Sequence, residues 1–190
     1  MKRTVIFLSL LLCFSLSYSQ TYNQLVVDDK GKEKLLGKIN REGLTSNSFK
    51  SWFDKNYDNY TPIEKLINTL KHSIKEYKIK LFLGTWCGDS KREVPRFYKV
   101  LDAVNFTEEQ LEVIAVDRIP EAYKKSPTGE EKGLNIRRVP TFIFYKDGKE
   151  VNRIVESPQV SLEDDIKAIL DGEYIPKYEK TTLAKKAERK

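Results

Sequence analysis

Cysteine, histidine and methionine are scarce in this sequence of 190 residues, which has two cysteines, one histidine and one methionine. The histidine, His72, has no second histidine or cysteine at ligand spacing, so we expect no metal site and no cofactor. Beyond the first 20 residues no stretch of about 18 apolar residues occurs, which excludes a predicted transmembrane helix. The net charge of +6 is modest. Because we find no nucleic-acid-binding motif, we expect no nucleic-acid partner.

Residues 1–19 are typical of a secretory signal peptide. Lys2 and Arg3 precede an apolar stretch that runs to Leu16, and the small residues Ser17 and Ser19 follow. We expect cleavage after Ser19. The mature chain is then exported, to a bacterial periplasm or fully secreted, without stable insertion in a membrane.

Cleavage would remove Cys13 and leave Cys87 as the only cysteine of the mature chain. Lipid attachment at Cys13 is an alternative, but bulky Leu12 and the apolar continuation at Phe14 argue against it. Exported proteins commonly carry disulfides. A single thiol in an oxidising compartment is therefore either buried and inert or exposed and used.

The remaining chain divides into three predicted parts: an N-terminal extension at 20–60, a main domain at 61–175 and a basic tail at 176–190. In the extension, apolar residues at 25–27 and 34–39 predict two short strands around a turn. The aromatic segment 46–60 is expected to pack on the main domain, with its structure unassigned. We expect the lysine-rich tail to be solvated rather than to contact nucleic acid or membrane.

Apolar periodicity, caps and turn residues predict the elements of the main domain. Thr61 as N-cap and Pro62 open a first helix, Pro95 should kink the second, and Ser161 and Gly172 bound the last. The predicted elements are a helix to Tyr77, a strand at 79–84, a helix at 88–104, a central strand at 111–117, a short helix and loop at 118–133, a hairpin at 139–155 around Asp147-Gly148, and a helix at 162–171. This order predicts an α/β fold with a mixed central sheet, partly parallel with an antiparallel edge, flanked by helices.

The segment Trp86-Cys87-Gly88-Asp89-Ser90 lies where the strand at 79–84 gives way to a helix. Unpaired N–H groups and the helix dipole stabilise an anion at a helix N-terminus, so a thiol there tends toward the thiolate. Asp89 opposes this tendency by its negative charge, whereas Lys91 and Arg92 favour it. The sequence thus predicts a nucleophilic thiol.

Three separated features resemble the thioredoxin family over residues 62–172. WCGDS stands in the place of the family's WCGPC, Pro95 follows Cys87 by eight residues, and Val139-Pro140-Thr141 leads into the hairpin strands. The resemblance implies a thioredoxin-like three-layer fold, to which the extension at 20–60 adds strands.

The resemblance also implies roles for single residues. Cys87 matches the attacking cysteine and Trp86 the tryptophan that shields it. Pro140 matches a proline whose cis peptide bond offers, with Val139, a backbone edge to a bound peptide. Gly88 and Asp89 complete the expected substrate-binding residues.

Two departures from the family limit the chemistry. Ser90 replaces the second, resolving cysteine, and Leu81 stands where the family often has a buried acid. We expect Ser90 to hydrogen-bond the thiolate and count it, with Cys87, as a catalytic residue. A single thiol can form a mixed disulfide, but its release needs another thiol.

We therefore favour an exported thiol–disulfide exchange enzyme that acts through Cys87 on cysteine-containing proteins or peptides. If the substrate's own cysteine releases the mixed disulfide, the result is isomerisation. If a small thiol or a reductase partner does so, the result is thiol-dependent reduction. The alternatives are a redox-inactive module that binds peptides in the Trp86–Pro140 groove, and a scaffold that acts through the extension and the tail.

Overall fold

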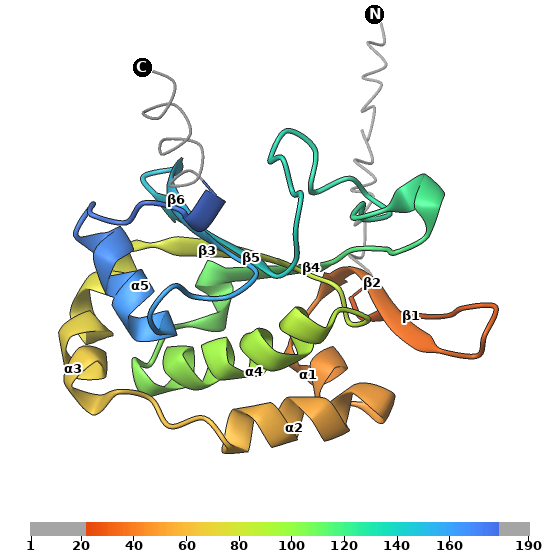
Figure 1. The fold of residues 1–190 in the computed structure, drawn as a ribbon, viewed down its shortest axis with the longest axis horizontal. Coiled ribbons are helices and arrows are strands. Elements are labelled where there is room, and N and C mark those ends of the chain that lie inside the picture. Colours follow the sequence, from red (N-terminus) through yellow and green to blue (C-terminus); the bar gives the residue numbers. More distant parts are fainter. Residues whose placement is uncertain (1–21, 179–190) are drawn as a thin grey trace, which may run out of the picture.

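The computed structural model describes residues 22–178, which form a six-stranded mixed sheet with strand order β1-β2-β4-β3-β5-β6 (Figure 1). The strands are β1 Gln24–Val27, β2 Glu33–Ile39, β3 Lys78–Leu83, β4 Leu111–Ala115, β5 Thr141–Lys146 and β6 Lys149–Val155. The predicted signal peptide and residues 179–190 of the predicted tail lie outside the described residues. The α/β fold class predicted from the sequence is confirmed.

The α-helices are α1 Arg41–Leu44, α2 Lys50–Asp58, α3 Glu64–Ser73, α4 Gly88–Ala103 and α5 Leu162–Leu170. Short 3₁₀ turns occur at Asn47–Phe49, Ile74–Glu76, Glu108–Gln110 and Pro120–Ala122. The aromatic segment that had no predicted structure is thus largely helical, and it packs on α4 through Phe53 and Tyr98, whose ring centres are 5.6 Å apart. In the described part of the chain, no helix has the length and apolar character needed to cross a membrane.

Strand pairing follows the predicted mixture of directions. β3 and β4 are parallel, whereas β5 pairs antiparallel with β3 on one side and with β6 on the other. The hairpin turn has positive φ angles at Asp147 (51°) and Gly148 (75°). Two consecutive positive φ angles define the turn that matches the right-handed twist of the strands, which explains why Asp-Gly occurs there.

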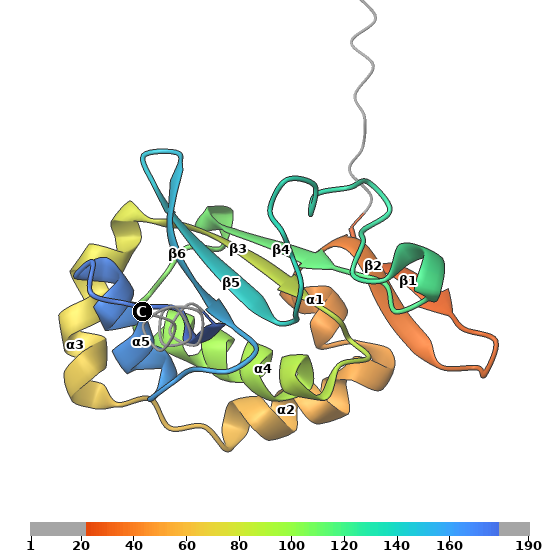
Figure 2. The same ribbon diagram turned by 45° about the horizontal axis from the view of Figure 1, so that its top comes forward.

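The N-terminal strands belong to the same sheet. β2 pairs antiparallel with β4, and β1 pairs with β2 at the sheet edge. β2 therefore covers the edge of β4 that would otherwise be open (Figure 2). The other edge of β4 pairs with β3, the strand that precedes Cys87.

The two faces of the sheet are covered differently. Alternate residues such as Leu81 and Phe142 join the large core beneath the helices, with the predicted inner residues of α4, Val94 and Phe97, fully buried. The opposite residues, such as Phe82 and Ile143, form a smaller cluster with Leu134 and Ile136 of the segment between β4 and β5, as well as with Trp86 and Cys87. The third layer over the site is thus built by a loop rather than by a long helix.

The start of α3 differs from the prediction. The helix begins at Glu64 with Ile63 as its N-cap residue, and no side chain caps it, so Thr61 is not the cap. Glu163, fully buried on α5, accepts hydrogen bonds from Tyr60 Oη (2.7 Å) and Ile63 N (3.1 Å). These long-range bonds hold Ile63 in an extended conformation. They outweigh the local preference for a helix capped by Thr61.

Candidate functional site

Cys87 lies at the junction between β3 and α4, as the sequence predicts. It is the N-cap residue of α4, with an extended backbone (φ −87°, ψ 130°), and its side chain is half-buried. Its N–H donates to Gly84 O (2.8 Å), and its carbonyl accepts from Lys91 N (3.0 Å). The backbone on both sides of the thiol is therefore fixed, with the free N–H groups of the helix start nearby.

The thiol contacts the loop before β5. Cys87 Sγ donates a hydrogen bond to Val139 O at 3.3 Å, and the Val139–Pro140 peptide bond is cis. Thr141 Oγ1 donates to Arg138 O (2.7 Å) and so ties the same loop to the first residue of β5. Residues 52 positions apart in the chain thus meet at the sulfur atom.

Trp86 covers the end of β3. Its indole lies against Gly84, and Nε1 donates to Val116 O at 2.9 Å. A β-carbon at position 84 would lie 2.5 Å from Trp86 Cε2, so only glycine leaves room for the ring in this position. The exposed ring of Tyr123 lies beside the indole, with ring centres 6.2 Å apart.

Ser90 is buried in the first turn of α4. Its side chain is fully buried, and its hydroxyl accepts a hydrogen bond from Gly84 N (3.2 Å); no hydrogen bond joins it to Cys87 Sγ in the described structure. The hydrogen bond that Ser90 was expected to donate to the thiolate is not formed among the described residues and stays a prediction for the ionised thiol. The buried N–H at the end of β3 needs an acceptor and takes the serine oxygen. Ser90 fixes the first turn of α4 against the sheet.

The charges on the first turn of α4 pair with one another. Arg92 donates to Asp89 Oδ1 (2.8 Å) and to Glu93 Oε1 (2.5 Å). Because Arg92 offsets Asp89, the carboxylate is not an unpaired negative charge beside the thiol. Gly88 is exposed at the start of the same helix.

A buried ion pair supports the site from the N-terminal strands. Lys34 Nζ on β2 is bonded to Asp117, and both side chains are less than one tenth exposed. Burial disfavours the charged form of Asp117, but Lys34 and the N–H groups of Arg118 and Ile119 outweigh burial, and the pKa of Asp117 lies below its ordinary value of 3.8. Leu35 N also donates to Thr85 Oγ1 (3.1 Å), directly before Trp86.

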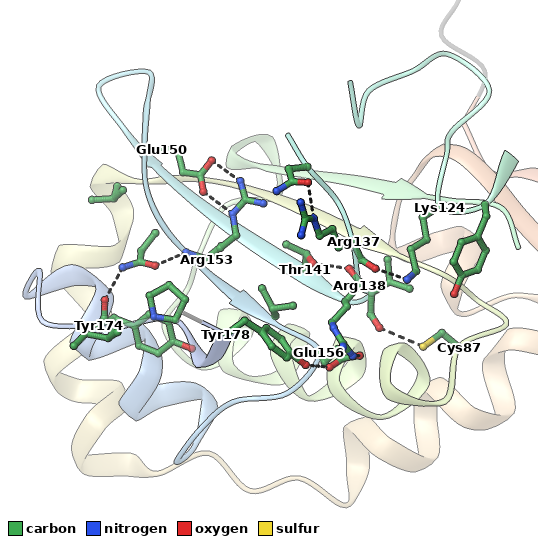
Figure 3. A pocket seen from close by; sticks show the side chains of 18 of the residues that line it. Cys87, Lys124, Arg137, Arg138, Thr141, Glu150, Arg153, Glu156, Tyr174 and Tyr178 are labelled. Atoms are coloured by element: carbon green, nitrogen blue, oxygen red, sulfur yellow. Dashed lines mark hydrogen bonds and ion pairs between the residues drawn. The ribbon is translucent and has the colours of Figure 1, made fainter. Parts of the chain in front are cut away.

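A groove of about 1210 Å³ begins at Trp86 and Cys87 and continues along β6 (Figure 3). Its walls come from four further segments: the loop at 123–124, the loop at 135–141, β6 with Glu156, and residues 174–178. Long grooves that join a nucleophile to backbone edges suit extended peptides.

The segment after α5 closes the far side of the groove. Asn152 Nδ2 donates to Tyr174 O (2.7 Å), and the Tyr178 hydroxyl is bonded to Glu156. The Arg138 guanidinium lies 4.6 Å from the centre of the Tyr178 ring and 2.8 Å from Glu156 Oε1 (Figure 3). Tyr178, which we placed in the solvated tail, thus contacts the loop that carries Val139.

The structure brings part of the predicted site together. Trp86, Cys87 and Val139 line the groove. Pro140, the next residue in the chain, is buried and is not among the lining residues. Gly88, Asp89 and Ser90 are not among the lining residues.

Sequence reasoning missed Tyr123, Lys124, Arg137, Arg138 and Tyr178 as lining residues. Arg137 and Arg138 could have been found, because they directly precede Val139-Pro140. Tyr123 and Tyr178 could not, since only the folding of the two segments places them at the groove.

Several known proteins with similar sequences are thioredoxins. The family model described as Thioredoxin matches residues 63–168. Thioredoxin Asp f 29 of Aspergillus fumigatus is 34% identical over 85 residues, which are 45% of this chain and 70% of that protein. Thioredoxin AMT13 of Alternaria alternata is 35% identical over 87 residues, which are 46% of this chain and 65% of that protein.

A crystal structure of mitochondrial thioredoxin 3 from Saccharomyces cerevisiae, in its oxidized form, is similar at 25% identity and a TM-score of 0.35, covering 59% of this chain and 97% of that one. The alignments to the two fungal thioredoxins each span less than half of this chain, and the extension at 20–60 lies outside the segment that the family model matches. Because that segment makes up more than half of the 190 residues, the chain belongs to the thioredoxin family.

Proposed function

We propose that this protein is an exported, single-thiol member of the thioredoxin family that exchanges disulfides in cysteine-containing proteins or peptides. One observation carries the proposal: half-buried Cys87 lines the groove with its Sγ 3.3 Å from Val139 O, whereas the position of a second thiol holds a buried serine. Family membership supports thiol–disulfide redox chemistry in general.

The first step is a displacement at sulfur. The Cys87 thiolate attacks one sulfur of a substrate disulfide; a Cys87–substrate disulfide forms, and the other substrate sulfur leaves as a thiolate with the electron pair of the broken bond. The groove beside Val139 positions the substrate, and the N-terminus of α4 stabilises negative charge on the sulfur before attack.

The second step needs a thiol from outside the mature chain, because cleavage after Ser19 would remove Cys13 and leave only Cys87. When a second cysteine of the substrate attacks its own sulfur in the mixed disulfide, Cys87 leaves as thiolate and the substrate is isomerised. When a small thiol attacks Cys87 Sγ instead, the substrate leaves as a thiolate and the small thiol stays joined to Cys87. A second small thiol then attacks the joined one, so that Cys87 leaves as thiolate and the two small thiols form a disulfide.

Capture of the mixed disulfide tests this proposal. The reduced mature chain, residues 20–190, is incubated with a disulfide-containing peptide, quenched with acid, and analysed by intact mass. We expect a covalent adduct at Cys87 that a reductant removes, and none with Cys87→Ser. A wild-type chain that forms no adduct while iodoacetamide labels Cys87 would refute the exchange function.

A redox-inactive binding module is the second candidate. It is favoured by the length of the groove, since about half of the lining residues lie along β6 and residues 174–178 rather than beside the thiol. In that case Cys87→Ser would leave peptide binding unchanged while no exchange is detected in the wild type.

Export is part of the proposal and rests on the basic, apolar and small-residue segments of residues 1–19. Expression in a Gram-negative host, followed by fractionation and N-terminal sequencing, tests it. We expect a periplasmic or secreted chain beginning at Gln20; a full-length chain in the cytosol would contradict export.

A further inference from the structure

The groove beside Cys87 carries unbalanced positive charge. We propose that this groove selects peptide segments with acidic side chains close to the cysteine that Cys87 attacks. The inference rests on the proposed exchange function and names the class of substrate for the same site.

The charged groups that line the groove are four cations and two carboxylates: Lys124, Arg137, Arg138, Arg153, Glu150 and Glu156. The two carboxylates are already paired within the wall. Glu156 Oε1 lies 2.8 Å from Arg138 Nη1, and Glu150 Oε1 lies 2.6 Å from Arg153 Nε. Two cations therefore remain without a carboxylate in the lining.

Lys124 and Arg137 are these two cations. Lys124 Nζ donates to Arg137 O and lies 4.5 Å from the centre of the Tyr123 ring. Arg137 Nε donates to the amide oxygen of Asn135 (2.9 Å). Within residues 22–178 neither side chain forms an ion pair with a carboxylate. Their partners are neutral, so their charges are not offset.

Lys124 lies on the Cys87 side of the groove, and Arg137 lies next to it toward the middle (Figure 3). Arg137 is two residues before Val139, whose carbonyl oxygen accepts from Cys87 Sγ, and Lys124 is attached to the backbone of Arg137. Because an extended chain advances about 3.3 Å per residue, residues adjacent to a cysteine held at Cys87 would come within reach of these side chains. A carboxylate there would gain a charge-assisted hydrogen bond.

Charge also indicates whether the groove binds a segment of another protein or the C-terminal residues of this chain. Residues 179–190 hold five Lys or Arg residues and two Glu residues, a net positive sequence. A groove with unpaired cations repels such a segment. An acidic segment of another protein is the occupant that the charges fit.

Binding without covalent chemistry is the first test. Fluorescein-labelled peptides that differ only in Glu, Gln or Lys on both sides of a central serine are titrated against the full chain with Cys87→Ser, using fluorescence anisotropy. We expect the Glu peptide to bind about fivefold more tightly than the Gln peptide at low salt, with the difference shrinking in high salt. The Lys peptide should bind most weakly.

The matched variants are Lys124→Gln and Arg137→Gln together, with Lys65→Gln as the control. Lys65 is an exposed cation on α3, away from the groove lining. The paired variants should abolish the preference for Glu, and the control should retain it. Equal binding of the three peptides, or a preference that survives loss of both cations, would overturn the inference.

The second test measures exchange. The same peptides, with a central cysteine activated as a disulfide with thionitrobenzoate, react with wild-type Cys87; the peptide sulfur joins Cys87, and thionitrobenzoate leaves with the electron pair and absorbs light. We expect the same order of rates, while the rate with uncharged iodoacetamide stays equal in all variants. Preferential binding without any exchange would refute the proposed function and support the selectivity of the groove. Exchange at equal rates with all three peptides would support the proposed function and refute the selectivity.

Discussion

Single residues hold the site in place through very short-range contacts. Gly84 shows this most clearly, because its N–H donates to Ser90 Oγ, its carbonyl accepts from Cys87 N (2.8 Å), and the Trp86 indole lies on its α-carbon. One residue without a side chain thus connects the end of β3, the thiol and the aromatic cover.

Gly84→Ala should displace the Trp86 indole, since the new β-carbon would lie 2.8 Å from Nε1. The hydrogen bond from Nε1 to Val116 O would be lost, at a cost of about 2 kcal/mol in the free energy of unfolding. Urea unfolding and tryptophan fluorescence, in a Trp52→Phe background, measure both effects.

Gly88→Ala is the matched control, because a β-carbon there meets no atom within 4 Å. It should leave the fluorescence unchanged and the stability equal or slightly raised, as alanine is the better helix residue. Similar spectral shifts in both variants would contradict the role assigned to Gly84.

Ser90→Cys should supply the missing resolving thiol. Residues 87 and 90 are about one helical turn apart, which brings a thiol at position 90 within reach of the sulfur that holds the substrate. After mixed-disulfide formation we expect release of the peptide thiol and an internal disulfide, seen as a loss of the adduct mass. Ser90→Ala, which adds no thiol, should keep the adduct. A stable adduct in Ser90→Cys would show that the buried side chain cannot reach Cys87.

At the scale of elements, the N-terminal strands are attached to the site by a buried charge pair. Asp117 directly follows the residue whose carbonyl holds Trp86, and its carboxylate is bonded to Lys34 of β2. Breaking a buried pair leaves an uncompensated charge, which costs far more than loss of an exposed pair.

Asp117→Asn should therefore lower the free energy of unfolding by about 3 kcal/mol. Glu76→Gln breaks an exposed pair with Lys146 (2.7 Å) and should cost less than about 1 kcal/mol. Urea titrations of both variants make the comparison. Equal losses would mean that the Lys34–Asp117 pair adds no more than a surface contact.

For the whole molecule, ionised carboxylates contribute to stability at several places in the fold. Burial opposes ionisation of these groups, but hydrogen bonds and ion pairs outweigh it, so each pKa lies below the ordinary value of 3.8 for Asp or 4.5 for Glu. The groups are Asp102, Glu112, Asp117, Glu130, Glu131 and Glu156.

A lowered pKa in the folded state means that protonation favours unfolding. The stability from these groups is complete above their ordinary pKa values and is lost as the pH falls through the lower values of the folded state. We expect the urea midpoint to be level from pH 7 to about pH 5 and to fall steeply below about pH 4. A midpoint that is the same at pH 3 and pH 7 would contradict this account.

The sequence by itself determined most elements of the main domain and the place of the thiol. The signals for these elements act over a few residues and can be recognised in the sequence alone. They are the alternating or helical apolar patterns, the Ser161 cap and the Asp147-Gly148 turn. In the structure, Ser161 Oγ accepts from Asp164 N (3.0 Å), and both turn residues have positive φ angles. The motif around Cys87 and the Val139-Pro140 pair are likewise local, and they locate the mouth of the groove.

The tertiary structure decided what those residues contact. Buried Glu163 accepts from Ile63 N and sets the start of α3, and the Lys34–Asp117 pair joins β2 to the residue that follows Val116. The charged wall of the groove joins the thiol to loops and to Tyr178, more than 90 residues later in the chain. No local pattern predicts such contacts. A buried polar group bonds to whichever partner the fold brings near it, and that partner can be far away in the sequence.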